Sequence, residues 1–184
     1  YVADLGVLDV PTIAAHCVKV SDEEILDTLE EYGVTDIELG VQSLNDNVLK
    51  LSERGHTVEQ TLKAVSMIKN RKFGLVLQLM PGLPGDTDET IRKTFKTAAE
   101  LAPDGVRIYP TVVITDTKLE TMYKTGEYCP LSLEKAVLLT AEAVMMFASK
   151  GIKIIRMGLH SSDLSQNNGV VGGPYHPAFG EMVI

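Results

Sequence analysis

The chain of 184 residues has no tryptophan, few aromatic residues (5%) and two cysteines. Cys17 and Cys129 stand far apart in the sequence and do not have the spacing of metal ligands. The sequence also lacks a signal peptide and an apolar run long enough to span a membrane. These absences favour a chain of the reducing cytoplasm that has no membrane partner.

The sequence also has no excess of basic residues. Its 25 acidic residues outnumber 17 basic ones and give a net charge of −8. A nucleic-acid-binding surface normally shows a basic patch or stripe. The charge therefore gives no support for nucleic-acid binding by this chain alone, although it does not exclude it. With 45% hydrophobic residues, the chain is long enough to bury one sizeable core, so we expect one domain or part of one.

The most informative stretch is residues 74–87, an apolar run that ends in a turn rich in proline and glycine. The run has the length and composition of a buried strand, and the turn after it predicts a tight loop. Gly82 and Gly85 allow positive φ angles and a close approach of a ligand to the main chain. Asp86 or Thr87 is then expected to cap the next helix. An ordinary strand-to-helix loop is the alternative interpretation.

Strands and helices alternate along the rest of the chain, which predicts an α/β fold with a parallel sheet. The expected strands are residues 11–17, 36–43, 74–80, 105–114 and 152–157, and helices are expected at residues 21–32, 45–52, 57–68, 88–101 and 132–151. A longer excursion is expected at residues 115–130, and turn-rich irregular chain after residue 160.

The strand at residues 36–43 places Glu38 and Gln42 on one side and only aliphatic residues on the other. Gln78, Arg107 and Arg156 likewise stand inside expected strands. A doubly wound sheet normally buries both faces of its central strands among aliphatic residues. The polar positions therefore favour an open or partial barrel with a polar interior.

Three segments together resemble the middle of the radical S-adenosylmethionine (SAM) enzymes, especially the group that holds oxygen-independent coproporphyrinogen oxidase and the catalytic subunit of Elongator. The segments are ELGVQS at 38–43, RGHT at 54–57 and QLMPGLPGDT at 78–87, and residues 107–128 resemble the Elongator-like branch more closely. The resemblance covers roughly residues 21 to 160. It implies a partial (β/α)6 TIM-like barrel over residues 1–160, here lacking its first strands, followed by an irregular tail at residues 161–184.

The chain departs from this family at the iron-sulfur motif. The family holds a [4Fe-4S] cluster with C-x-x-x-C-x-x-C, and this motif is absent here, so the chain supplies no metal ligands. We expect a fragment or an N-terminally truncated chain that is inactive by itself. A degenerate relative without a cluster is the alternative.

The resemblance assigns cofactor roles to four residues. Gln42 matches the glutamine that hydrogen-bonds SAM, and Arg54 matches the arginine that pairs with the SAM carboxylate. Gln78 stands where coproporphyrinogen oxidase has an aspartate that binds the ribose, and Val112 matches a position whose main chain meets the adenine.

Strand parity also permits four residues to face the substrate; these are Glu38, Arg107, Tyr109 and Arg156. Nothing in the sequence identifies a catalytic acid or base.

The activity implied by the resemblance is reductive cleavage of SAM to a 5′-deoxyadenosyl radical, with an electron donor protein as partner. The Elongator-like branch implies transfer RNA as substrate, bound mainly through the missing N-terminal part. Two alternatives remain: a non-catalytic barrel that binds a nucleotide or a partner, and a barrel enzyme that binds phosphate at the loop from Gly82 to Gly85.

Overall fold

The computed structural model describes residues 13–15, 23–159 and 169–184 of the chain. Its strands are β1 (Ile13–Ala15), β2 (Asp36–Gln42), β3 (Gly74–Leu79), β4 (Gly105–Ile108), β5 (Val113–Ile114), β6 (Lys153–Met157) and β7 (Val170–Gly172). Its helices are α1 (Glu23–Glu31), α2 (Asp46–Leu51), α3 (Val58–Lys69), α4 (Asp88–Glu100), α5 (Lys118–Thr125), α6 (Leu133–Ser149) and α7 (Phe179–Val183). Cys17, His160 and the expected start of the first helix at Ser21 lie outside the described residues.

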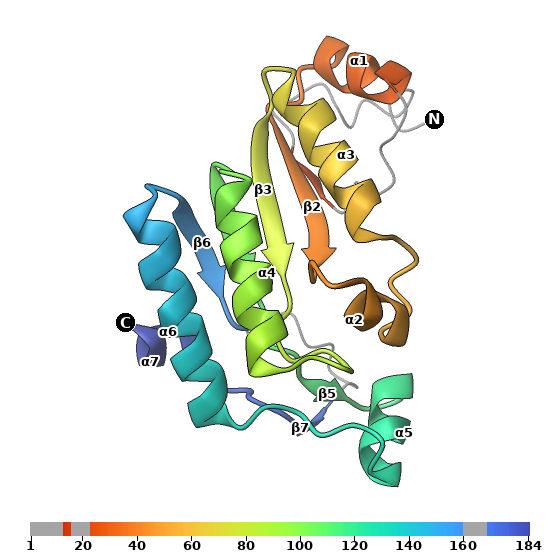
Figure 1. Ribbon diagram of the computed structural model, residues 1–184, viewed down its shortest axis with the longest axis vertical. Helices are drawn as coiled ribbons and strands as arrows, with labels where there is room; N and C mark the ends of the chain where they lie inside the picture. The colour runs from red at the N-terminus through yellow and green to blue at the C-terminus, as the bar shows by residue number, and fades with distance from the viewer. Residues whose placement is uncertain (1–12, 16–22, 160–168) are drawn as a thin grey trace.

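Five strands form one parallel sheet in the order β1-β2-β3-β4-β6, and every pairing within it is parallel. Helices α3, α4 and α6 lie side by side over one face of this sheet (Figure 1). The strands end at the same edge, where α2, α5 and the small antiparallel pair of β5 and β7 gather (Figure 1). The predicted α/β fold with a parallel sheet is therefore present.

The core lies between the sheet and these helices. Aliphatic residues alternate along each central strand, and their side chains pack against the buried stripes of the helices. Fully buried members are Ile37, Leu39, Val41, Leu75, Leu77, Leu79, Val106 and Ile108 from the sheet and Ile68, Ile91, Phe95, Leu139 and Phe147 from the helices. Phe95 and Phe147 meet edge to face, with ring centroids 6.3 Å apart, and so join α4 to α6.

Two helices begin at the capping boxes that the sequence offers. Thr57 and Gln60 satisfy each other's backbone N–H groups at the start of α3, and Thr87 and Thr90 do the same at the start of α4. Asn45 caps α2 with its side-chain oxygen, as expected for a helix that begins there. None of the described helices has the length and apolar character needed to cross a bilayer.

The structure corrects the expected strand at residues 105–114. This segment forms β4 in the main sheet and the separate strand β5, which pairs with β7 instead. Pro110 has no N–H to donate, and the N–H groups on either side of it bind the carbonyls of Leu79 and Pro81. The chain therefore leaves the sheet at Pro110.

The described part of the segment after residue 160, which we expected to be irregular, contains β7 and α7. Helix α7 packs against α6 and β6. Phe179 is buried there, and that contact holds the short helix in place. The boundary at residue 160 between a barrel and a tail stays a prediction.

The helical spacing of the sequence predicted Ile25, Tyr32 and Leu62 on the buried faces of their helices, but each of these residues is exposed by more than a third. The helical period was right, but these residues lie at the flank of each stripe and not at its centre. In α6 the sequence spacing of Leu133, Val137, Ala141, Val144 and Ala148 predicted the buried face. The fully buried apolar residues are instead their near neighbours Ala136, Leu139, Ala143 and Phe147.

Candidate functional site at the carboxyl ends of the strands

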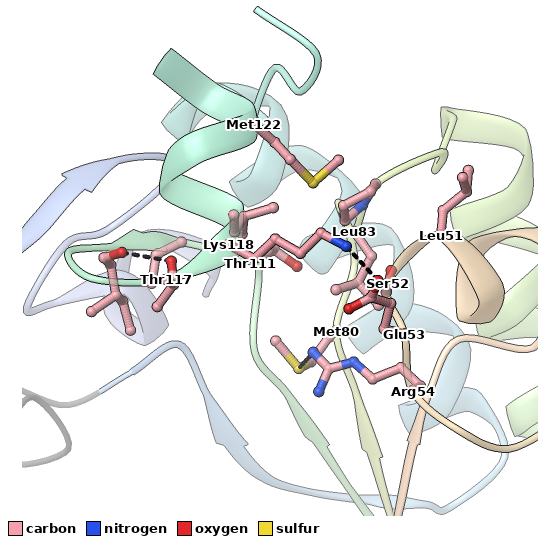
Figure 2. Close-up of a pocket in the computed structure, with 14 residues that line it drawn as sticks. Leu51, Ser52, Glu53, Arg54, Met80, Leu83, Thr111, Thr117, Lys118 and Met122 are labelled. Atoms are coloured by element: carbon pink, nitrogen blue, oxygen red, sulfur yellow. Dashed lines mark hydrogen bonds and ion pairs between the residues drawn. The ribbon is translucent and has the colours of Figure 1, made fainter. Parts of the chain in front are cut away.

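Two neighbouring pockets open at the edge of the sheet where the strands end. The Arg54 pocket has a volume of about 220 Å³ and lies between the α2–α3 loop, the β3–α4 loop and α5. Its lining includes Ser52, Glu53, Arg54, Met80, Leu83, Thr111, Val112, Ile114, Lys118 and Met122 (Figure 2). The Tyr109 pocket has a volume of about 360 Å³ and is lined by Gln78, Met80, Tyr109, Pro110, Val112, Ile114, Arg156 and Leu159. Met80, Val112 and Ile114 border both pockets, so the two are adjacent.

The loop after β3 places Met80 at the boundary between the pockets. Hydrogen bonds to the N–H and to the carbonyl of Gly82 hold this loop in place. Gly82 has a φ of +88°, which favours glycine. Its N–H donates to Asp86 Oδ2 at 3.1 Å, and its carbonyl accepts the Tyr128 hydroxyl at 2.6 Å. Asp86 Oδ1 also accepts the Thr90 hydroxyl at 2.6 Å. The loop is thus preorganised from two directions.

The Asp86 carboxylate accepts hydrogen bonds from main-chain N–H groups of the loop after β3. Burial raises the pKa of Asp86, while hydrogen bonds from Thr90 and from the Gly82 and Leu83 N–H groups act in the opposite direction. These N–H groups are therefore used by the protein's own carboxylate. The expected alternative of a phosphate cradle at this loop finds no free donors at Gly82.

Arg54 extends from the α2–α3 loop toward the centre of its pocket (Figure 2). Its Nη2 lies 3.3 Å from Met80 Sδ, a weak acceptor for a guanidinium. Loss of water around the guanidinium lowers the pKa of Arg54, although the residue as a whole is exposed. Among the described residues, no carboxylate lies within ion-pair distance of Arg54. The guanidinium is thus available to a carboxylate or another small anion.

Above Arg54, Lys118 of α5 forms an ion pair with Glu53 and so bridges two walls of the pocket (Figure 2). Both side chains are about two-thirds exposed, so the pair contributes little to stability.

Gln42 and Gln78 meet each other beneath the pockets. Gln42 is buried at the end of β2 with a φ of +62°, where the pairing between β2 and β3 shifts its register. The Gln78 side-chain NH₂ donates to Gln42 Oε1 at 3.3 Å. Gln78 reaches the Tyr109 pocket, whereas Gln42 lines neither of the two pockets. Each amide keeps capacity for a further hydrogen bond.

The polar face of the sheet gathers the residues that we expected to face a substrate. Glu38 is buried, and its Oε2 lies 3.0 Å from Arg107 Nε, an ion pair without a well-aligned hydrogen bond. Arg107 Nη1 donates to the Tyr109 hydroxyl at 3.4 Å. That hydrogen bond and the charge of Glu38 raise the pKa of Arg107. Arg156 of β6 stands in register with Arg107, which is itself in register with Gln78.

The structure thus divides the predicted cofactor residues between the two pockets. Arg54 and Val112 line the Arg54 pocket, while Gln78 and Val112 line the Tyr109 pocket together with Tyr109 and Arg156. Val112 is the residue common to both sets. The assignment of these residues to SAM or to a substrate stays a prediction.

Sequence reasoning did not assign roles to two buried hydroxyl groups of the Arg54 pocket. Thr111 Oγ1 and Ser52 Oγ have no hydrogen-bond partner among the described residues, and Thr111 is only 2% exposed. Parity within the expected strand at residues 105–114 places Thr111 on the face of Arg107, but β4 ends at Ile108 and Thr111 lines the Arg54 pocket. A buried polar atom without a partner costs free energy, so these hydroxyls are suited to a bound polar ligand.

The two histidines that the structure describes, His56 and His176, both make hydrogen bonds to the main chain. The two ring nitrogens of His56 lie 3.2 and 3.3 Å from the carbonyls of Arg54 and Val41, and His176 Nδ1 accepts the N–H of Ala178 before α7. Within the described ranges, no group of three or more His, Cys, Asp or Glu residues could hold a metal ion. Cys129 is exposed and forms no disulfide.

Two family models match consecutive parts of the chain. The model of the radical SAM superfamily matches residues 8–98, and the model of the radical SAM C-terminal domain matches residues 103–184. The chain belongs to the radical SAM superfamily.

Two relatives with similar sequences come from an archaeon and a yeast. The chain is 43% identical over 120 residues to a tRNA uridine(34) acetyltransferase of Methanocaldococcus infernus, and 36% identical over 124 residues to Elongator complex protein 3 of Saccharomyces cerevisiae. These matches cover 64% and 66% of this chain. The chain spans 22% of the length of each relative.

The solved structures agree with the radical SAM fold. The structure of M. infernus Elp3 with an N-terminal deletion superposes with a TM-score of 0.78 at 32% identity, over 90% of this chain and 38% of that one. Coproporphyrinogen III oxidase of Escherichia coli superposes with a TM-score of 0.62 over 78% of this chain and 33% of that one, at 21% identity, which supports the fold only. The expected partial radical SAM barrel and the Elongator-like resemblance are confirmed.

Membership of the radical SAM superfamily implies SAM and an iron-sulfur cluster, and the described residues fit these two groups differently. Arg54 without a carboxylate partner, the amide of Gln78 and the unpartnered hydroxyls suit the charged and polar ends of SAM. A cluster needs cysteine thiolates, and the sequence has only two cysteines, of which Cys129 is exposed. The residues present do not fit the cluster.

Proposed function

We propose that this chain forms the SAM-binding part of a radical SAM enzyme that modifies transfer RNA. The observation that carries the proposal is the Arg54 guanidinium, which lies beside Met80 and Val112 at the ends of the strands and has no carboxylate partner among the described residues. SAM carries a carboxylate, a sulfonium, a ribose and an adenine. When bound, it supplies the 5′-deoxyadenosyl group that gives this superfamily its radical chemistry.

Each proposed contact follows from a residue's chemistry. Arg54 donates two parallel hydrogen bonds to the SAM carboxylate and keeps its positive charge. Gln78 and Gln42 give an amide pair beneath the cofactor, in which Gln78 bonds the ribose hydroxyls. Val112, buried between the two pockets, offers main-chain groups to the adenine edge. The protein's contribution is to orient the cofactor and exclude water.

The transfer-RNA part of the proposal is supported by the similarity to the tRNA uridine(34) acetyltransferase of M. infernus. The net charge of −8 indicates that this chain contributes little of the phosphate contacts. We therefore propose that residues 1–184 alone bind transfer RNA weakly and have no turnover, and that an electron donor acts with the complete enzyme in the cytoplasm.

Calorimetric titration of SAM into the chain tests the cofactor assignment. Replacing Arg54→Ala removes hydrogen bonds to a charged group, which contribute about 1.5–3 kcal/mol, so we expect affinity for SAM to fall about tenfold or more. Arg71→Gln, at the opposite end of β3, serves as the matched control and should leave affinity unchanged.

An unchanged affinity in Arg54→Ala would remove Arg54 from the site. Wild-type chain that binds a partner protein or another nucleotide but no SAM would favour the non-catalytic barrel instead.

A further inference from the structure

Helix α5 forms one wall of the Arg54 pocket and lies outside the hydrophobic core. None of its residues is fully buried. Leu119 and Met122 line the pocket, and the Tyr123 ring lies against Gly172 of β7. Because glycine has no side chain, this contact does not interlock the helix with β7. Helix α5 is therefore a wall that can change position without disrupting the core.

The first turn of α5 is held together by hydrogen bonds within the segment itself. The Thr117 side chain accepts the Glu120 N–H, and Glu120 Oε2 accepts the Asp116 N–H at 3.0 Å. Lys124, near the other end of the helix, forms an ion pair with the same Glu120. These bonds move with the helix, so α5 can shift as one rigid unit.

Residues with left-handed backbone angles stand at both ends of α5. Asp116 has a φ of +60° before the helix, and Gly126 has a φ of +79° after it. Hinges are usually a few residues at the ends of elements, which absorb changes in backbone angles. Beyond Gly126, the hydrogen bond from the Tyr128 hydroxyl to the Gly82 carbonyl fixes the chain again. We therefore place hinges at Asp116 and Gly126.

An ion pair connects α5 to the α2–α3 loop across the Arg54 pocket (Figure 2). Lys118 Nζ binds Glu53 Oε1, and both side chains are about two-thirds exposed. An exposed ion pair contributes little free energy and breaks readily. On its outer side Glu53 borders a separate groove of about 700 Å³, which gives its side chain space to swing away from the pocket.

Two hydroxyl groups in the pocket walls lack both water and a hydrogen-bond partner. Ser52 Oγ and Thr111 Oγ1 are buried, and neither has a partner in the part of the chain that the structure describes. Each costs free energy that contact with water or a ligand would recover. The pocket itself measures about 220 Å³, below the roughly 300–1,000 Å³ typical of small-molecule sites. Both observations favour a second, wider arrangement.

We propose that residues 116–126 form a hinged lid over the Arg54 pocket, with the ion pair of Lys118 and Glu53 as its latch. The lid opens when this ion pair breaks, admits SAM, and closes over the cofactor when the ion pair forms again. The inference rests on the proposed function for the identity of the ligand, but the movement does not depend on it. Since the ion pair is present with and without cofactor, it sets the rates of SAM entry and exit and not the affinity.

The lid is tested first without ligand, by NMR relaxation dispersion of the methionine methyl groups in the whole chain. Met122 belongs to the lid, and Met145 on the exposed side of α6 is the reference. We expect exchange on the microsecond to millisecond timescale at Met122 and not at Met145. Lys118→Met should raise the open population about two- to fivefold, as expected for loss of an exposed ion pair. Lys124→Met breaks an ion pair within α5 and is the matched control without effect.

Surface plasmon resonance then measures how fast SAM binds to the chain and leaves it. Lys118→Met and Glu53→Gln should each raise the association and dissociation rates about two- to fivefold, and should change Kd by less than about twofold. The double variant with Glu53→Lys and Lys118→Glu should restore the rates of the wild type. If the two side chains instead contacted SAM directly, their loss would raise Kd through the dissociation rate alone.

The proposal is overturned if Met122 shows no exchange, if Lys118→Met leaves the open population unchanged, or if this variant changes Kd without changing the association rate. Failure of SAM to bind the wild-type chain would overturn the proposed function. In that case the exchange at Met122 in the free chain still decides whether the lid exists.

Discussion

The two faces of the parallel sheet are built from the same strands and have opposite chemistry. Leu77 of β3 is completely buried under the helices, while its neighbour Gln78 lies on the other face beside Gln42. Ile37 and Glu38 of β2 show the same contrast. Since successive side chains of a strand point to opposite faces, one strand can stabilise the fold with one residue and present a functional group with the next.

The aliphatic face of the sheet stabilises the fold, and the polar face presents the functional groups. The helix-covered face is continuous aliphatic packing, in which burial itself gives the stabilisation. The polar face contains an ion pair, an amide pair and an arginine in register, arranged around open space. Such groups are costly to bury without partners, so their presence inside a sheet indicates a site and not a core.

The largest expected effect comes from breaking the aliphatic face. Leu77→Ala removes a fully buried side chain and leaves a cavity, so we expect the free energy of unfolding to fall by about 2–5 kcal/mol. Urea unfolding followed by circular dichroism measures this change. An effect below about 1 kcal/mol would mean that the helices do not pack on β3 as described.

The sequence predicted features that depend on local chemistry. The spacing of Thr57 and Gln60 predicted the capping box of α3, and of the two caps expected for α4, Asp86 or Thr87, the structure shows Thr87. The parity of β2 was also correct, because it depends on residues within a few positions of one another. The strand at 105–114 failed because hydrophobicity alone does not show where Pro110 turns the chain toward β7. Exposure of Ile25 and Leu62 depends on the angle at which each helix docks, which a periodic pattern does not contain.

For the site, the sequence supplied candidate residues but not their grouping. The resemblance to the family identified Arg54, Gln42, Gln78 and Val112 as candidates. Their separation into two pockets, however, depends on loops that lie far apart in the chain. The loop contact from Tyr128 to Gly82 joins residues 46 positions apart. Hydroxyl groups such as that of Thr111 are too common in sequences to be singled out before their burial is known.

The second prediction concerns the hydrogen bond from Tyr128 to the loop after β3. Tyr128→Phe removes the hydroxyl that binds the Gly82 carbonyl and leaves this buried acceptor without its partner. We expect a loss of about 1–3 kcal/mol in the free energy of unfolding, together with weaker SAM binding as Met80 loses its fixed position. Unfolding in urea and calorimetry measure the two effects. Tyr123→Phe on the exposed side of α5 is the matched control.

The third prediction concerns Gln78, the neighbour of Leu77 on the polar face of β3. Gln78→Leu should lower the free energy of unfolding by only about 1 kcal/mol, the net value of one hydrogen bond, because a barrel interior tolerates an apolar residue. SAM affinity should fall several-fold, since leucine cannot bond the ribose. If calorimetry instead shows full affinity in a variant that unfolds easily, Gln78 is a structural tie to Gln42 and not a cofactor contact.

The smallest expected effect concerns charge on the outside of the helix layer. Arg92 of α4 forms two hydrogen bonds with Glu142 of α6, at 2.6 and 2.9 Å, and these bonds lower the pKa of Glu142. A carboxyl whose pKa is lower in the folded state stabilises the fold above its unfolded value of about 4.5. This contribution disappears as the pH falls through the folded value.

We therefore expect Glu142→Gln to lower the urea midpoint slightly at pH 6 and not at all near pH 2, where wild type and variant should coincide. High salt should shrink the difference at pH 6, because the pair is exposed. Glu100→Gln, at the exposed end of α4, controls for the loss of one negative charge. If the urea midpoints of wild type and Glu142→Gln still differ near pH 2, residue 142 stabilises the fold through packing and not through its charge. The outer surface of the helix layer would then be stabilised by packing, as the aliphatic face of the sheet is.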